Sequence, residues 1–228
     1  ILPDIAAAAR SLRVLELTNV ETQSRRAQPW RAQLSNPNLI ALFSSCSNLV
    51  SLSLPQLHPK CASSSVALPL LPELRVLSFP VPTETPILER VLAACPQLEA
   101  LRIAARNQAV LCDELPDTLR VLDILFFAQT ATSWRNPEVF RVDAAVLRRL
   151  AALPLHALRL WNMEPFNDFW TVQAVEFATL TSLEIVASAA ASCALFGVAR
   201  FAALTNLDVC DSAGLLDLLP STLLRLTL

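Results

Sequence analysis

The chain has 228 residues, of which 54% are hydrophobic and only 17% are charged. This balance excludes a disordered chain, because too much apolar side chain is present to stay solvated. The formal net charge is −2, whereas a nucleic-acid-binding domain usually carries a basic excess, so nucleic acid is not an expected partner.

A six-residue pattern, L-x-x-L-x-L with Ile, Val or Phe allowed at the last position, recurs along the whole chain. We call it the strand motif and number its positions one to six. Alternating apolar residues are typical of a short strand with one buried face, and such strands bury that face by stacking on their neighbours. The copies, in chain order, are LRVLEL (12–17), LVSLSL (49–54), LRVLSF (74–79), LEALRI (98–103), LRVLDI (119–124), LHALRL (155–160), LTSLEI (180–185), LTNLDV (204–209) and LLRLTL (223–228).

The spacers between the motifs differ in kind. Four of them contain apolar residues at helical spacing, which predicts helices at 39–46, 87–95, 143–153 and 197–204. The two long spacers, 18–38 and 125–142, are predicted to be loops. Proline ends the spacers shortly before the strands, at Pro96, Pro116, Pro154 and Pro220, which suits its inability to continue a helix.

The motif spacing suggests an internal duplication. Successive motifs start 37, 25, 24 and 21 residues apart, and then 36, 25, 24 and 19 residues apart. We therefore predict a single domain, 1–228, built from two tandem four-repeat units at about 12–118 and 119–228. The alternative is a set of irregular repeats whose lengths coincide.

Two segments carry a family resemblance. PILERVLAACPQLEALRI (86–103) and LIALFSSCSNLVSLSL (39–54) resemble the cysteine-containing leucine-rich repeats of F-box proteins, and the repeats as a whole are similar to those of ribonuclease-inhibitor-like proteins. The resemblance implies an α/β leucine-rich-repeat solenoid: a curved arc with a parallel inner sheet of about nine short strands and helices or extended segments outside. It also implies a substrate-recruiting adaptor. The asparagine typical of the third position after the motif is absent, and no F-box precedes the first motif.

Residues between the motif leucines should line the concave, exposed face of the sheet. Charged residues at position five and apolar residues directly after the motif gather in the middle and second half of the chain, a mixture typical of protein interfaces. Two alternatives remain open: the charges form solvated surface ion pairs, or Trp161 packs beneath the following loop (162–170). The predicted partner-binding residues are Arg102, Asp123, Leu125, Arg159, Trp161, Glu184 and Val186.

Catalytic chemistry has little support in the sequence. The two histidines, His58 and His156, lack the neighbours of a nucleophile–base pair or a metal site, and two glycines cannot build a phosphate-binding loop. We therefore expect no enzyme activity, no cofactor and no metal. The predicted function is a protein–protein interaction module. The alternative is a structural subunit of a large multiprotein assembly.

Location and chain ends complete the expectations. The uncharged stretch 185–199 is too short and too rich in Ala and Ser to cross a membrane, and no signal peptide is visible. None of the six cysteines forms a C-x-x-C pair, which favours reduced thiols in an intracellular, cytoplasmic protein. The sequence stops inside the ninth motif, so we expect further chain or another subunit to cover an apolar end.

Overall fold

The computed structural model of the chain is a mixed α/β structure with a large complement of parallel strands and few helices. The described residues are 11–17, 36–54, 66–80, 85–105, 115–126, 144–163, 175–187, 199–210 and 219–227. The chain divides into two compact units, an N-terminal unit (Ile1–Ala104) and a C-terminal unit (Ala105–Leu228). This division precedes the predicted boundary at 118/119, and the duplication itself stays a prediction.

Every copy of the strand motif forms a strand, which confirms the expected number of nine. Each strand begins at motif position three, two residues after the first motif leucine. The strands are β1 (Val14–Glu16), β2 (Ser51–Ser53), β3 (Val76–Phe79), β4 (Ala100–Ala105), β5 (Val121–Phe126), β6 (Ala157–Met163), β8 (Ser182–Ala187), β10 (Asn206–Cys210) and β11 (Arg225–Thr227).

Within each unit, the strands are parallel neighbours in chain order. The N-terminal unit has the order β1-β2-β3-β4, and the C-terminal unit has β5-β6-β8-β10-β11. The printed register aligns identical motif positions, so that Leu15 lies opposite Leu52 and Leu183 lies opposite Leu207. Because side chains alternate along a strand, this register stacks the motif leucines in rows on one face. In all but the first and last strands, these leucines are buried.

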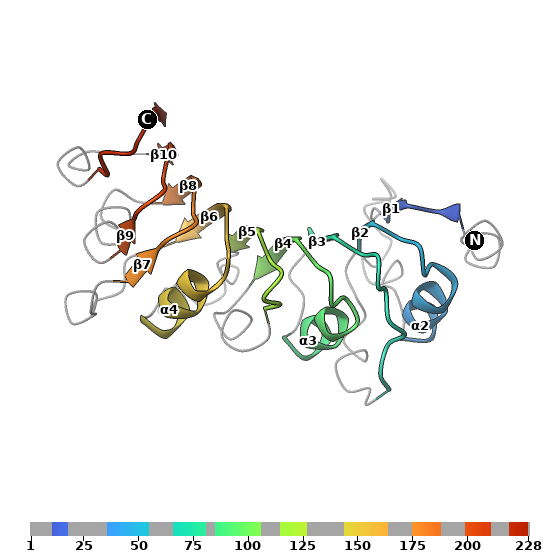
Figure 1. The fold of residues 1–228 in the computed structure, drawn as a ribbon. Coiled ribbons are helices and arrows are strands. Elements are labelled where there is room, and N and C mark those ends of the chain that lie inside the picture. Colours follow the sequence, from blue (N-terminus) through green and yellow to red (C-terminus); the bar gives the residue numbers. More distant parts are fainter. Residues whose placement is uncertain are drawn as a thin grey trace, which may run out of the picture. The chain divides into compact units, whose positions relative to one another are not determined.

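Three of the four predicted helices are confirmed. They are α2 (Asn36–Ser45), α3 (Thr85–Ala93) and α4 (Ala144–Ala152). Each buries the apolar side chains that recur every three or four residues, as in the α4 residues Val146, Leu147 and Leu150. Figure 1 shows α2 and α3 on one side of the strands in the N-terminal unit, so these helices cover the leucine face.

The fourth predicted helix, 197–204, is wrong. The segment contains strand β9 (Ala199–Phe201), which pairs in parallel with β7 (Val175–Phe177), a strand that the motif did not predict. Both three-residue strands alternate buried, exposed, buried, and the rings of Phe177 and Phe201 stack with centroids 5.3 Å apart. Aromatic side chains favour strands. A helix at 197–204 would require the contact between Phe177 and Phe201 to be lost.

The loop predictions for the long spacers are wrong at their margins. Residues 36–38 begin α2, and residues 125–126 end β5. The rest of both spacers lies outside the described residues.

Threonine hydroxyls bind the backbone of neighbouring strands in the C-terminal unit. Thr181 Oγ1 donates to the carbonyl of His156 at 3.0 Å, and Thr205 Oγ1 donates to the carbonyl of Thr181 at 3.1 Å. Thr179 and Thr222, which directly precede their motifs, donate to the first-position carbonyls of Leu155 and Leu204. These repeated bonds satisfy carbonyls where the chain turns into each strand.

Two cysteines occupy equivalent places at the ends of helices in the N-terminal unit. Cys46 and Cys95 each lie three residues before a motif, and each carbonyl accepts a hydrogen bond from the first motif leucine. Both are buried free thiols. Burial raises the pKa of the Cys46 thiol, and it raises the pKa of Cys95 from 9.0 to about 12, because a buried thiolate loses its hydration. The side chains of the other four cysteines lie outside the described residues.

Candidate functional site

The C-terminal unit brings six of the seven predicted binding residues together on three adjacent strands. The register forms one charged row, in which Asp123 lies opposite Arg159 and Arg159 lies opposite Glu184. It forms a second row from Leu125, Trp161 and Val186, two residues further along the same strands. Residues two apart share a face of a strand, so both rows lie on the face opposite the buried leucines.

The seventh predicted residue belongs to the N-terminal unit. Arg102 is on β4, opposite Ser78 of β3, and its side chain is exposed. It lies on the corresponding face of its own unit.

An ion pair joins two of the three members of the charged row, Arg159 and Glu184. Arg159 Nε lies 2.9 Å from Glu184 Oε2, and the side chains are 54% and 26% exposed. Asp123 is different, because it is only 8% exposed and is the one buried charged residue in the described part of the chain. The row therefore runs from a buried carboxylate on β5 to a solvated ion pair on β6 and β8.

The apolar row has Trp161 at its centre. Leu125, Trp161 and Val186 are each partly exposed. The register shifts directly after Trp161, where Asn162 is an extra residue in β6 and forms a β-bulge against β8. Bulges change the direction of neighbouring side chains and are common beside functional sites.

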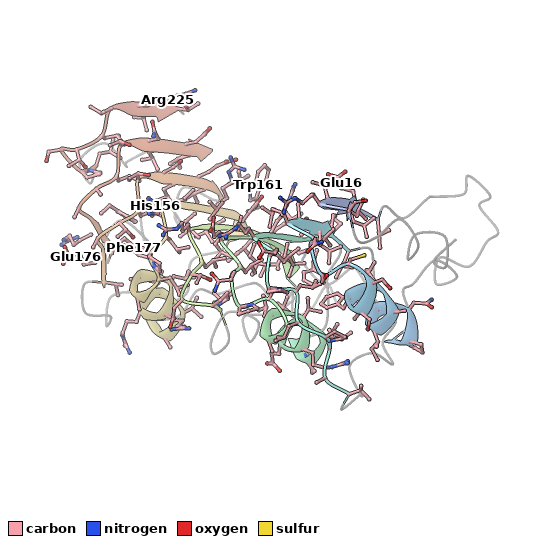
Figure 2. The ribbon with its side chains drawn as sticks, turned by 45° about the vertical axis from the view of Figure 1, so that its right-hand side comes forward. Glu16, His156, Trp161, Glu176, Phe177 and Arg225 are labelled. Atoms are coloured by element: carbon pink, nitrogen blue, oxygen red, sulfur yellow. The ribbon has the colours of Figure 1, made fainter. Side chains whose placement is uncertain are left out.

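The polar atom of Trp161 is also distinctive. Its indole Nε1 is buried, and it has no hydrogen-bond partner among the described residues. Figure 2 shows Trp161 and His156 toward opposite ends of β6. The alternative in which a loop covers Trp161 concerns residues 162–170, of which 164–170 lie outside the described part, so the exposed anchor stays a prediction.

A groove of about 340 Å³ continues the charged row toward β11. It extends the site beyond the predicted residues, because third-position residues share the face with fifth-position residues. The alternation of the strand could have identified them, but the prediction followed only the fifth position and the residue after the motif. The lining residues are Arg159, Ser182, Leu183, Glu184, Asn206, Leu207, Asp208, Arg225 and Thr227.

Second-position residues form contacts along one edge of the strands. Arg75 forms an ion pair with Glu99 in the N-terminal unit. In the C-terminal unit, the Arg120 guanidinium lies 3.3 Å from Nε2 of His156, whose side chain is exposed. These arginines and the histidine therefore contact neighbouring strands of their own chain at the surface.

Within the described segments, no three His, Cys, Asp or Glu residues gather where they could hold a metal ion. No helix of those segments is long and apolar enough to cross a membrane. Compared with known proteins, the chain matches no protein-family model and no curated protein sequence.

Proposed function

We propose that the chain is a leucine-rich-repeat solenoid that acts as a protein–protein interaction module. Its binding surface is the exposed face of β5, β6 and β8. The observation that carries the proposal is that the strand register forms a charged row and, beside it on the same face, an apolar row centred on Trp161. The in-register alignment of the strand motifs within each unit supports the solenoid. A recruiting adaptor is the form of this function that the repeat resemblance favours.

The residue types on this face suit protein recognition. Tryptophan and arginine are the residues most enriched among those that dominate binding energy at protein interfaces, and charged groups around an apolar centre give specificity. Leu125, Trp161 and Val186 are each partly exposed, so part of the apolar row is accessible to a partner.

The size of the face favours a peptide segment over a large globular surface. Even with β10 and β11 included, five strands spaced about 4.8 Å apart span only about 19 Å, and five residues of strand extend about 16 Å. The resulting area, about 300 Å², is well below the roughly 800 Å² that each partner buries in a standard interface. Contacts made by this face alone therefore fit a short extended segment of a partner.

Alanine substitutions at Arg159 and Trp161 test this function. Affinity capture with the purified wild-type chain defines a set of bound proteins, and we expect the double variant to lose more than nine-tenths of them. Arg200→Ala is the matched control, because Arg200 is an exposed arginine on β9, away from the two rows. Retention of every captured protein by the double variant would contradict the proposal.

A second candidate, a structural subunit of a large assembly, is favoured by one observation. Leu224 occupies the second position of the last motif and is 85% exposed, and Leu223 and Leu226 beside it are only partly buried. A subunit of this kind should aggregate or unfold without its neighbours. Light scattering after size-exclusion chromatography separates the candidates, because a monomer with a cooperative melt contradicts this one.

The buried free thiols of Cys46 and Cys95 support an intracellular location for either candidate. Neither candidate includes a catalytic step, a cofactor or a metal.

A further inference from the structure

We propose that the groove over β8, β10 and β11 binds an extended segment of a partner protein that carries a basic side chain two residues away from an acidic one. The basic side chain lies at Asp208 and the acidic one at Arg225. This inference rests on the proposed function, since it names the chemistry of the segment that the C-terminal unit binds.

The charges that line the groove leave one carboxylate and one guanidinium for a ligand. Arg159 and Glu184 neutralise each other in a 2.9 Å ion pair. Asp208 and Arg225 are both exposed, and neither forms an ion pair within the described part of the chain. The groove is therefore complementary to one positive and one negative group.

The register makes the position at Asp208 favourable for a cation. Asp208 lies directly opposite Glu184 on the neighbouring strand, and like charges in directly opposed positions of a sheet destabilise each other. The Arg159 guanidinium reduces this repulsion from the far side of Glu184. A lysine or arginine of the partner, placed over Asp208, removes the rest of it.

The distance between the two free charges matches an extended segment. Arg225 lies opposite Asn206, and Asp208 lies opposite Thr227, so the two are one strand apart and two residues apart along the strand. Figure 2 shows Arg225 on β11. From strand geometry, their Cα atoms are separated by about 8 Å, while an extended peptide places side chains i and i+2 on one side about 7 Å apart.

The remaining polar lining suits the backbone of such a segment. Ser182, Asn206 and Thr227 bring hydroxyl and amide groups to the groove. The Asn206 Nδ2 donates to Thr205 Oγ1 at 3.1 Å, which orients the amide and leaves its oxygen as an acceptor. An N–H of the bound segment can donate to this oxygen, as main-chain donors do when an extended peptide is recognised.

Binding of four synthetic peptides tests the proposal. Fluorescein-labelled nonapeptides share neutral flanks and differ only in their centre, which is Lys-Ser-Glu, Lys-Ser-Gln, Gln-Ser-Glu or Gln-Ser-Gln. Fluorescence anisotropy with the full chain should show Lys-Ser-Glu binding at least tenfold more tightly than Gln-Ser-Gln, with the other two between them. Equal affinities, or no measurable binding by any peptide, overturn the proposal.

Single substitutions assign each charge to its residue. Asp208→Asn should abolish the preference for Lys over Gln and keep the preference for Glu, whereas Arg225→Gln should do the opposite. Glu176→Gln, at the exposed middle position of β7 and not among the groove residues, should change none of the four affinities. Preferences that survive both groove substitutions overturn the proposal. Loss of protein capture by the Arg159 and Trp161 double variant, together with peptides that do not discriminate, leaves the proposed function standing and removes this inference alone.

Discussion

The two units use the same strand motif but place different residues on the face opposite the motif leucines. In the N-terminal unit, position five holds Glu16, Ser53, Ser78 and Arg102, so two serines separate the charged residues. In the C-terminal unit, β6, β8 and β10 present Arg159, Glu184 and Asp208 at position five. The motif leucines therefore determine the strands and their register, while the residues between them determine the charge of each exposed face.

The covering layer also differs between the units. The motifs at Leu74 and Leu98 are 24 residues apart, and so are the motifs at Leu180 and Leu204. The first pair encloses α3, but the second encloses β9. Equal spacer length thus permits either element, and the local side chains decide which one forms.

The largest expected loss of stability comes from a substitution in the β7–β9 pair of the C-terminal unit. Phe177→Ala should destabilise the chain by about 3–5 kcal/mol, because it removes a buried ring and leaves a cavity. Phe177 is 3% exposed and stacks on Phe201. Urea unfolding gives the loss, and hydrogen exchange should locate it in the C-terminal unit. The neighbouring exposed residue provides the control, Glu176→Ala, for which a change within about 0.5 kcal/mol is expected. Equal losses from both substitutions would contradict the layer as described.

The dependence of stability on pH tests a buried thiol of the N-terminal unit, Cys95. Because the folded-state pKa of Cys95 is raised to about 12 from 9.0, both states keep the thiol protonated below pH 9, and its contribution is fully present there. Above pH 9 the unfolded chain loses this proton first, so the free energy of unfolding falls by up to about 1.4 kcal/mol per pH unit. Urea titrations at pH 8 to 10.5 measure the slope. Cys95→Ala should show a shallower slope, and an unchanged slope would be inconsistent with this thiol as its source.

Both units contain a hydrogen bond from a helix arginine to a backbone carbonyl, and we expect its loss to reduce stability equally in each unit. Arg90 of α3 donates from Nη2 to the carbonyl of Val66 at 2.5 Å, and Arg149 of α4 donates to the carbonyl of Leu115 at 2.7 Å. Replacing either arginine with methionine keeps the apolar stem and removes the donor, so we expect a loss of about 1–2 kcal/mol in each case. Thermal unfolding of both variants measures the losses. A loss in only one unit would show that the two bonds are not equivalent.

The smallest stability effect is expected at the site itself. Glu184→Gln removes the ion pair with Arg159 and should change the free energy of unfolding by less than about 1 kcal/mol, because exposed pairs contribute little. Capture of partner proteins should nevertheless weaken, since the charged row is altered. A stability loss as large as that of Phe177→Ala would assign this pair to the fold rather than to recognition.

The strands were predictable from the sequence because every motif carries the alternation that defines a half-buried strand. The helices at 87–95 and 143–153 were predictable for the same reason, since their apolar residues recur at helical spacing. The segment around Phe201 was not, because β9 lies outside the strand motif and three residues alone are too few to show a period. Its structure depends on Phe177, which lies in a different repeat. The two rows of the site followed from motif positions, whereas Arg225 required the third position to be followed as well.

The shared starting point of the nine strands has a consequence for how this chain tolerates change. Distances between successive motif starts vary from 19 to 37 residues while the register stays in phase within each unit, and lengthening a loop adds little closure entropy. Insertions between motifs should therefore be nearly silent. One residue inserted inside a motif would instead invert that strand, turning its leucines to water and its charges into the core. Length variation is accordingly confined to the layer that covers the leucines, so the spacing of the exposed side chains is independent of the lengths of the segments between the strands.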